Sequence, residues 1–166
     1  MDKSKKVITQ KTSGSKHRQD DKSSNDIVKT ITTTINNLDP GLQAYKIREL
    51  VEHAGEFGPY LRNQRLETNQ IRKFLDAINR VKADLIGDET NNQQENQQQT
   101  TFADIEDDIV LLKPKLAYAA ARQRAAKPLS DVMSAAIDKV HSIEDFTRLV
   151  QFIESIIAYH KAAGGK

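Results

Sequence analysis

The sequence predicts an all-α protein, a small bundle of about five helices. Three observations lead to this fold class. Alanine, leucine, isoleucine, lysine, arginine, glutamate and glutamine dominate the second half of the chain, and most of these residues favour helices. Only seven glycines and four prolines interrupt the 166 residues. Apolar residues also recur every three or four positions in several segments, which is the spacing of one helix face.

The first expected helix lies in DIVKTITTTINNL, residues 26–38. Ile27, Ile31, Ile35 and Leu38 are three or four positions apart, which predicts one apolar helix face. The β-branched residues of this segment have low helix propensity. We therefore expect a short helix, with a strand as the alternative, although the sequence shows no partner strands.

A second helix is expected from Gly41 to about Ala54. It follows Asp39 and Pro40, which suit the N-cap and the first helical position. Its predicted end is GEFGPY, residues 55–60, because two glycines and a proline should stop a helix.

The third helix, from Thr68 to Gly87, has the clearest amphipathic pattern. Thr68 is a suitable N-cap, and Gly87 is a suitable end. The apolar face consists of Ile71, Phe74, Leu75, Ile78, Val81 and Leu85. Residues 88–101, DETNNQQENQQQTT, contain no apolar side chain, so we expect a flexible Asn/Gln-rich loop.

Helical structure is expected to resume after this loop. Thr101 and Asp104 have the spacing of a capping box. The apolar face that follows consists of Ile105, Ile109, Leu112 and Leu116. Pro114 lies within it and predicts a kink, because proline lacks an N–H and clashes with the carbonyl of Val110.

Two further helices complete the predicted bundle. One runs over residues 129–140, after Pro128. The last begins at Ser142, with Asp145 as its capping-box partner, and Gly164 suits the left-handed position after its end. Its expected buried face consists of Phe146, Leu149, Val150, Ile153, Ile156, Ile157 and His160.

The net charge of +2 is unevenly distributed along the chain. Residues 1–25 hold seven Lys or Arg against three Asp and have almost no apolar residue. We expect this segment to be a disordered basic tail. Residues 26–166 are then one helical domain, with the loop at 88–101 inside it.

Several protein classes are excluded by composition. Cysteine is absent, so neither disulfides nor thiolate chemistry is available. The first residues include cations but no apolar run of a secretory signal, and no segment is apolar enough for a membrane span. We expect a soluble, cytoplasmic protein that has no contact with a membrane.

Catalytic and metal-binding patterns are also missing. The four histidines do not have metal-ligand spacing, and there is neither a glycine-rich phosphate loop nor a serine nucleophile elbow. The acids Asp104, Glu106, Asp107 and Asp108 could suggest a divalent metal, but acids in a first helical turn are better explained by the helix dipole. We expect no enzymatic activity, no cofactor and no metal.

The positive charges are more informative. KPKLAYAAARQRAAK, residues 113–127, contains five cations and no carboxylate. Lys115 and Arg122 are seven positions apart and should project in nearly the same direction, with Tyr118 between them. Lys113 and Arg124 flank this face, and Lys127 extends the row. We expect these cations to be unpaired and held along one stiff helix.

A second basic group contains Arg72 and Lys73. A solvated charged face is the alternative reading for either group. However, residues 109–130 lack the interspersed acids of such a face, and the nearest acids are segregated upstream. The pattern therefore favours binding of a nucleic-acid backbone, sensitive to salt and indifferent to sequence.

Three motifs carry a family resemblance. LETNQIRKFLDAINRV, LLKPKLAYAAARQ and FIESIIAYHKAAGGK, in that order, resemble the small helical subunit of type III-A CRISPR–Csm effector complexes. The resemblance runs from about Leu66 to the C-terminus and includes Lys161 in its last motif. Ala121, where the family usually has glycine, and Pro114 depart from its pattern.

The resemblance implies a non-catalytic subunit of a ribonucleoprotein that acts in antiviral defence. Copies would stack head to tail beside the backbone subunits, close to the large subunit, and would contact guide RNA and target RNA. The residues expected to contact RNA are Arg72, Lys73, Lys113, Lys115, Tyr118, Arg122, Arg124, Lys127 and Lys161. A helical adaptor that binds only protein partners is the alternative function.

Overall fold

The protein is all-α. The computed structural model describes residues 17–90 and 101–166, and every regular element in these ranges is helical. The α-helices are α1 (His17–Asn36), α2 (Ile47–Asn63), α3 (Thr68–Thr90), α4 (Phe102–Val110), α5 (Leu112–Arg122), α6 (Lys127–Ile137) and α7 (Ile143–Ala162). Two 3₁₀ turns, η1 (Leu42–Ala44) and η2 (Arg124–Ala126), connect them. The predicted fold class is confirmed, and residues 27–36 are helical rather than extended.

Helix α7 lies at the centre of the bundle and contacts α2, α3 and η1. Six of the seven side chains predicted to form its buried face are buried, and Ile157 is partly buried. Phe152 is buried as well, on the side toward Tyr45. The buried apolar side chains of α7 lie on one face and join those of the other described helices in one core.

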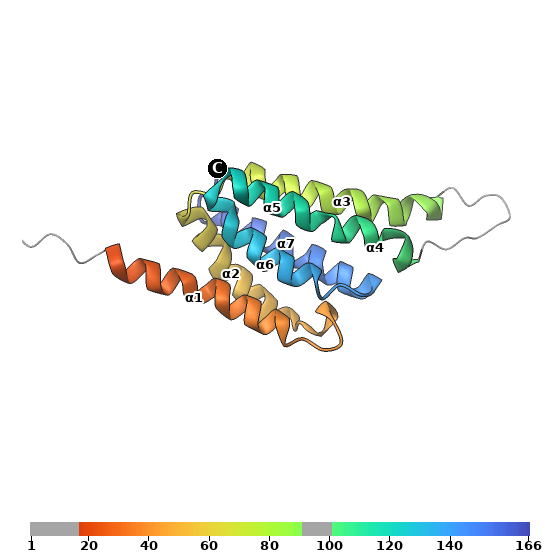
Figure 1. Cartoon of the computed structure of the whole chain (residues 1–166), viewed down its shortest axis with the longest axis horizontal. Coiled ribbons are helices and arrows are strands. Elements are labelled where there is room, and N and C mark those ends of the chain that lie inside the picture. Colours follow the sequence, from red (N-terminus) through yellow and green to blue (C-terminus); the bar gives the residue numbers. More distant parts are fainter. Residues whose placement is uncertain (1–16, 91–100) are drawn as a thin grey trace, which may run out of the picture.

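Helices α3, α4 and α5 lie side by side on one side of the molecule (Figure 1). Helix α3 contacts both α4 and α5, while α5 also packs on α6. Leu112 and Leu116 of α5 are buried, as are Ile71, Phe74 and Ile78 of α3. This packing holds the remaining faces of α3 and α5 next to each other at the surface.

The predicted end of the second helix is wrong. Instead of stopping at residues 55–60, α2 continues through both glycines and through Pro59 to Asn63. Gly58 lies where α2 crosses α7, and a Cβ atom there would be 2.6 Å from the backbone nitrogen of His160. Burial of Phe57 and Leu61 on either side of Pro59 offsets the hydrogen bond that proline removes.

The chain before α2 also differs from the prediction. Asp39 and Pro40 do not start an α-helix; the 3₁₀ turn η1 follows Gly41, and α2 begins only at Ile47. The carboxylate of Asp145 accepts a hydrogen bond from the N–H of Gln43 (2.6 Å) and so attaches this turn to α7.

The capping predictions had mixed outcomes. Ser142 caps α7 by accepting from the N–H of Asp145 (3.1 Å), and the capping box of Thr101 and Asp104 is present, so both are confirmed. Gly164 has the predicted positive φ of 86°. Asp145, however, accepts from the N–H of His141 (3.0 Å) instead of closing a box with Ser142.

Thr68 does not cap α3, because its polar groups are used by the C-terminal segment. Its N–H donates to the carbonyl of Lys166 (2.6 Å). His160 donates from Nε2 to the carbonyl of Leu66 (2.8 Å), which leaves Nδ1 to accept from the Thr68 hydroxyl (3.2 Å). Tertiary contacts between the start of α3 and the end of α7 thus replace the predicted cap.

The kink predicted at Pro114 is present as an interruption of the helix at Leu111, three residues before the proline, between α4 and α5. In contrast, the prediction that one stiff helix extends over the whole basic run is wrong. Helix α5 ends at Arg122, Gln123 is extended, and α6 begins at Lys127 rather than at residue 129. Pro128 fits the first turn of α6, where its missing N–H would have no helical partner.

The edges of the two predicted disordered segments are helical. Helix α1 begins at His17, inside the predicted tail of residues 1–25, and α3 extends past Gly87 to Thr90. Buried Ile31 and Ile35 anchor α1 to the bundle, and a nucleated helix extends through polar residues at little cost. The remaining parts of both predictions, residues 1–16 and 91–100, lie outside the described residues.

Candidate nucleic-acid interface

A groove of about 460 Å³ lies between α3 and α5. Its floor is apolar and includes Leu66, Phe74, Leu116 and Leu129, all of which are buried. The residues that line the groove from the two helices have the same spacing along the chain. Gln70, Lys73, Phe74 and Ala77 line the groove from α3, and Lys115, Tyr118, Ala119 and Arg122 line it from α5. Residues at i, i+3, i+4 and i+7 share one helix face, so each helix presents one face to the groove.

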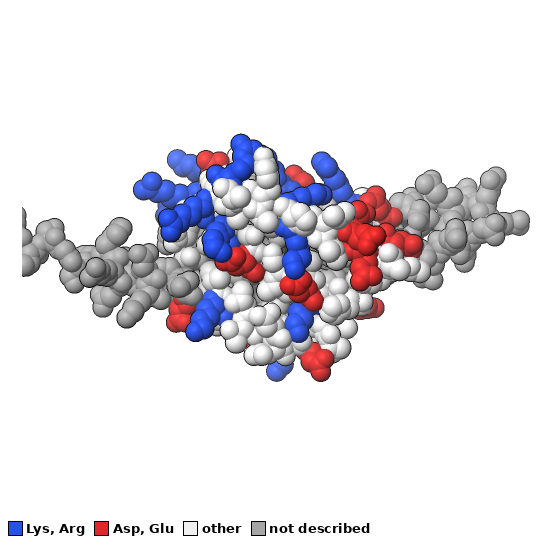
Figure 2. Space-filling view, viewed as in Figure 1, with Lys and Arg blue, Asp and Glu red and all other residues white. Residues whose placement is uncertain are grey.

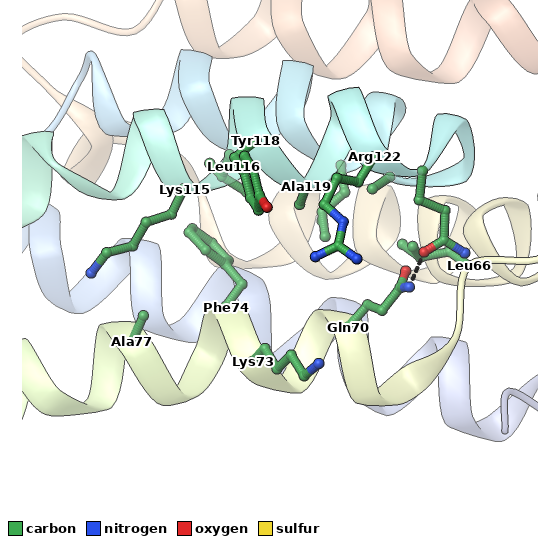
Figure 3. A pocket seen from close by; sticks show the side chains of 13 residues that line it. Leu66, Gln70, Lys73, Phe74, Ala77, Lys115, Leu116, Tyr118, Ala119 and Arg122 are labelled. Atoms are coloured by element: carbon green, nitrogen blue, oxygen red, sulfur yellow. Dashed lines mark hydrogen bonds between the residues drawn. The ribbon is translucent and has the colours of Figure 1, made fainter.

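Three of the predicted cations surround this groove (Figure 3). Lys115 and Arg122 project from α5 on either side of Tyr118, and Lys73 projects from the facing helix α3. The guanidinium of Arg122 lies 5.7 Å from the centre of the Tyr118 ring, which is 65 % exposed. The structure thus brings together residues from two motifs that are about 40 positions apart in the sequence.

No carboxylate among the described side chains lines the groove. Lys73, Lys115 and Arg122 make no ion pair with any of the residues that the structure describes. Three positive charges around one apolar floor raise the local potential and attract a polyanion. The groove therefore combines two of the five cations of the basic run, Lys115 and Arg122, with Lys73 of the second basic group.

Two of the predicted cations are neutralised within the molecule, which corrects the expectation that all five are unpaired. Lys113 pairs with Asp138 (2.5 Å), and Lys127 pairs with Asp131 (2.9 Å). Lys127 and Asp131 are four positions apart within α6, so their pair is local to one helix, whereas Asp138 reaches Lys113 because α6 packs on α5. The absence of acids between residues 109 and 130 was therefore not sufficient to show that these lysines are unpaired.

The other three candidates are exposed but do not line the groove. Arg72 directly precedes Lys73, so its side chain lies about 100° around the axis of α3 from that of Lys73. Arg124 lies in η2, after the end of α5, and Lys161 lies near the end of α7. An extended polyanion would have to leave the groove to reach any of them.

Sequence reasoning missed the amides of the groove. Gln70 donates from Nε2 to Oε1 of Gln123, and Oε1 of Gln70 is buried with no partner among the described residues. An unsatisfied buried acceptor costs about 1–3 kcal/mol. The spacing of three between Gln70 and Lys73 was the available signal, since it places both side chains on one helix face.

The acids of α4 form a separate surface. Asp104, Glu106, Asp107 and Asp108 are all exposed, and we call them the α4 acidic surface. Hydrogen bonds from the backbone and side chain of Thr101 lower the pKa of Asp104. Figure 2 shows red atoms gathered at the end where α4 begins, while blue atoms are densest at the opposite, upper left end of the molecule. The molecule therefore separates its charges in space.

The described residues contain no group of three or more His, Asp or Glu placed to hold a metal ion. None of the described helices combines the length and the apolar character needed to cross a membrane. The most distinctive surface is therefore the groove, whose cations, exposed tyrosine and apolar floor suit a ligand with phosphates and flat rings.

Comparison with known proteins agrees with this picture. No curated protein and no solved structure matches the chain. A family model described as Csm2 Type III-A matches residues 44–166, which is most of the chain and includes the groove. The chain therefore belongs to the Csm2 Type III-A family, the small subunit of the type III-A CRISPR–Csm effector complex.

Proposed function

We propose that this subunit binds the backbone of guide and target RNA through the groove between α3 and α5, without sequence specificity. The observation that carries this proposal is a groove lined, among the described residues, by three cations and no carboxylate. Lys115 and Arg122 are separated by about 10 Å along α5, which is comparable to one or two phosphate intervals. Arginine can also contact a phosphate with two parallel hydrogen bonds.

The subunit acts without catalysis in this proposal, inside a cytoplasmic ribonucleoprotein that contains the other effector subunits. Arg72, Arg124 and Lys161 are exposed and would assist where the RNA leaves the groove. Copies of the chain would stack head to tail, with the α4 acidic surface of one copy toward a basic surface of the next. A dipolar subunit favours such a heterologous contact.

Binding of a labelled single-stranded RNA at rising salt, followed by fluorescence anisotropy, tests this proposal. Three neutralised phosphates predict a slope of log K against log salt of about −2. The double variant Lys115→Glu, Arg122→Glu should lose most of the affinity. As a control, Lys29→Glu, Lys46→Glu makes the same change in net charge at exposed positions outside the groove. An equal loss in both variants, or a flat response to salt, would contradict the assignment.

The alternative adaptor function is separated from RNA binding by nuclease treatment of the assembled complex. An adaptor would keep all of its protein contacts after RNA digestion and would show no crosslink to RNA. The carboxylate-free groove favours RNA, because a protein partner alone does not require an unpaired cation on each side of an exposed ring.

A further inference from the structure

We infer that the groove between α3 and α5 also holds one unstacked nucleobase, so that it binds a nucleotide rather than only phosphates. This inference rests on the proposed RNA binding. Phosphate contacts need only cations and backbone N–H groups, and these occur on flat surfaces. The groove has additional features that a phosphate would not use.

The first feature is the apolar interior. At about 460 Å³, the groove is within the range of pockets that enclose small molecules. Its floor includes Phe74 and Leu116, and Tyr118 projects into it from α5, opposite Phe74 of α3 (Figure 3). Unstacked RNA bases are commonly bound against aromatic side chains, since every base has a flat π-face. Phosphates gain nothing from such a floor.

The second feature is the unpaired acceptor of Gln70. Its Oε1 is buried and lacks a partner among the described residues, while its Nε2 is occupied by Gln123. Each of the four RNA bases carries at least one N–H donor on its Watson–Crick edge. One acceptor can therefore bind any base, which agrees with recognition that does not depend on sequence.

The third feature is the position of the cations. Lys73, Lys115 and Arg122 lie around the apolar floor, where they can hold the phosphates on either side of an inserted base. A base inside a duplex cannot reach such a floor, so the bound nucleotide has to be unpaired or bulged. The ligand class is thus single-stranded RNA, or a duplex with one nucleotide extruded.

The test compares two labelled RNA duplexes that differ in one atom group. Each has a single bulged nucleotide, which is adenosine in one duplex and an abasic ribose in the other. Both have the same number of phosphates and the same charge. We expect the full chain to bind the adenosine bulge roughly tenfold more tightly than the abasic bulge.

A pair of variants on α5 then locates the site. Ala119 and Ala117 are both exposed, but only Ala119 lines the groove. Ala119→Leu fills the groove and should abolish the preference for adenosine, whereas Ala117→Leu should keep it. Circular dichroism checks that both variants are folded, and Tyr118→Ala supplies a second variant that removes the stacking surface.

The outcomes separate this inference from the proposed function. Equal affinity for both bulges, or a preference that survives Ala119→Leu and Tyr118→Ala, overturns the base site while salt-dependent binding still supports backbone contact. Equal affinity is also the result expected if the groove binds a protein side chain. No binding of either RNA at low salt overturns the proposed function together with the base site.

Discussion

The two lysines beside Pro114 have the same charge but opposite surroundings. Lys113 forms an ion pair with Asp138, while Lys115 lies on the groove without an acidic partner among the described residues. A cation that already has a carboxylate partner gains less from a phosphate, because the new contact replaces an existing one. We therefore expect Lys113 and Lys115 to contribute differently to the proposed RNA binding.

This difference predicts the effects of two single substitutions. Lys115→Ala should weaken binding of single-stranded RNA roughly fivefold at low salt and make the slope of log K against log salt about 0.7 less negative. Lys113→Ala should leave both values nearly unchanged and lower stability by at most about 1 kcal/mol. Anisotropy titrations of both variants check this prediction, and equal slopes in the two would contradict it.

The stability of the folded chain depends on the protonation of Tyr45. It is fully buried and hydrogen-bonds with Nδ1 of His53 (2.5 Å). Burial, with a smaller contribution from Glu49, raises the pKa of Tyr45 well above its ordinary value of 10.0. The folded state thus disfavours the phenolate. Stability from this group is present below pH 10.0 and is lost as the pH rises from there toward the folded pKa.

We therefore expect Tyr45→Phe to cost about 1 kcal/mol near pH 8, because the hydrogen bond with His53 is lost. The difference between the variant and the native chain should narrow above pH 10, since only the native chain has this tyrosine to ionise on unfolding. Urea unfolding at a series of pH values measures this difference in the free energy of unfolding between the variant and the native chain. A constant difference up to pH 11 would show that Tyr45 does not titrate on unfolding.

At the scale of helices, a glycine allows α2 and α7 to pack closely. Gly58 is buried where α2 crosses α7, and a Cβ atom there would lie 2.6 Å from the nitrogen of His160 and 2.8 Å from Cβ of Tyr159. At Gly55 of the same helix, the nearest atom would be 3.7 Å away, in the ring of Tyr159. The same substitution should therefore have opposite effects at the two positions.

We expect Gly58→Ala to destabilise the chain by about 1–3 kcal/mol, because α2 and α7 must move apart. Gly55→Ala should stabilise it by about 0.5–1 kcal/mol, because alanine is the better helix former. Free energies of unfolding in urea measure both changes. A stabilising effect of Gly58→Ala would contradict the close approach of α2 and α7 at this position.

The separation of charge matters at the scale of the whole molecule. The α4 acidic surface lies on α4, whereas the cations of the groove lie on α3 and α5. If copies stack head to tail as proposed, sedimentation should show association that increases with concentration and weakens with added salt.

Reversing two charges of the α4 acidic surface tests whether this surface forms the contact between copies. Asp107→Lys, Asp108→Lys should shift the chain toward monomer at low salt. Asp26→Lys, Glu52→Lys changes the net charge equally at exposed positions elsewhere and should leave association unchanged. Association that is insensitive to salt and to both variants would contradict an electrostatic stacking contact.

The sequence by itself determined the features that depend on local spacing. Helix faces, the cap at Ser142, the capping box at Thr101 and the break near Pro114 follow from residues within one or two turns of each other. The shared direction of Lys115 and Arg122 follows from the same periodicity, which is why a candidate nucleic-acid surface was visible before the fold.

Tertiary structure decided everything that depends on distant partners. In the folded chain α2 continues through Pro59, and Lys113 forms an ion pair with Asp138. Gln70 donates a hydrogen bond to Gln123, which is 53 residues away. The physical reason is that burial and charge pairing depend on what packs opposite a residue, and local periodicity contains no information about that neighbour.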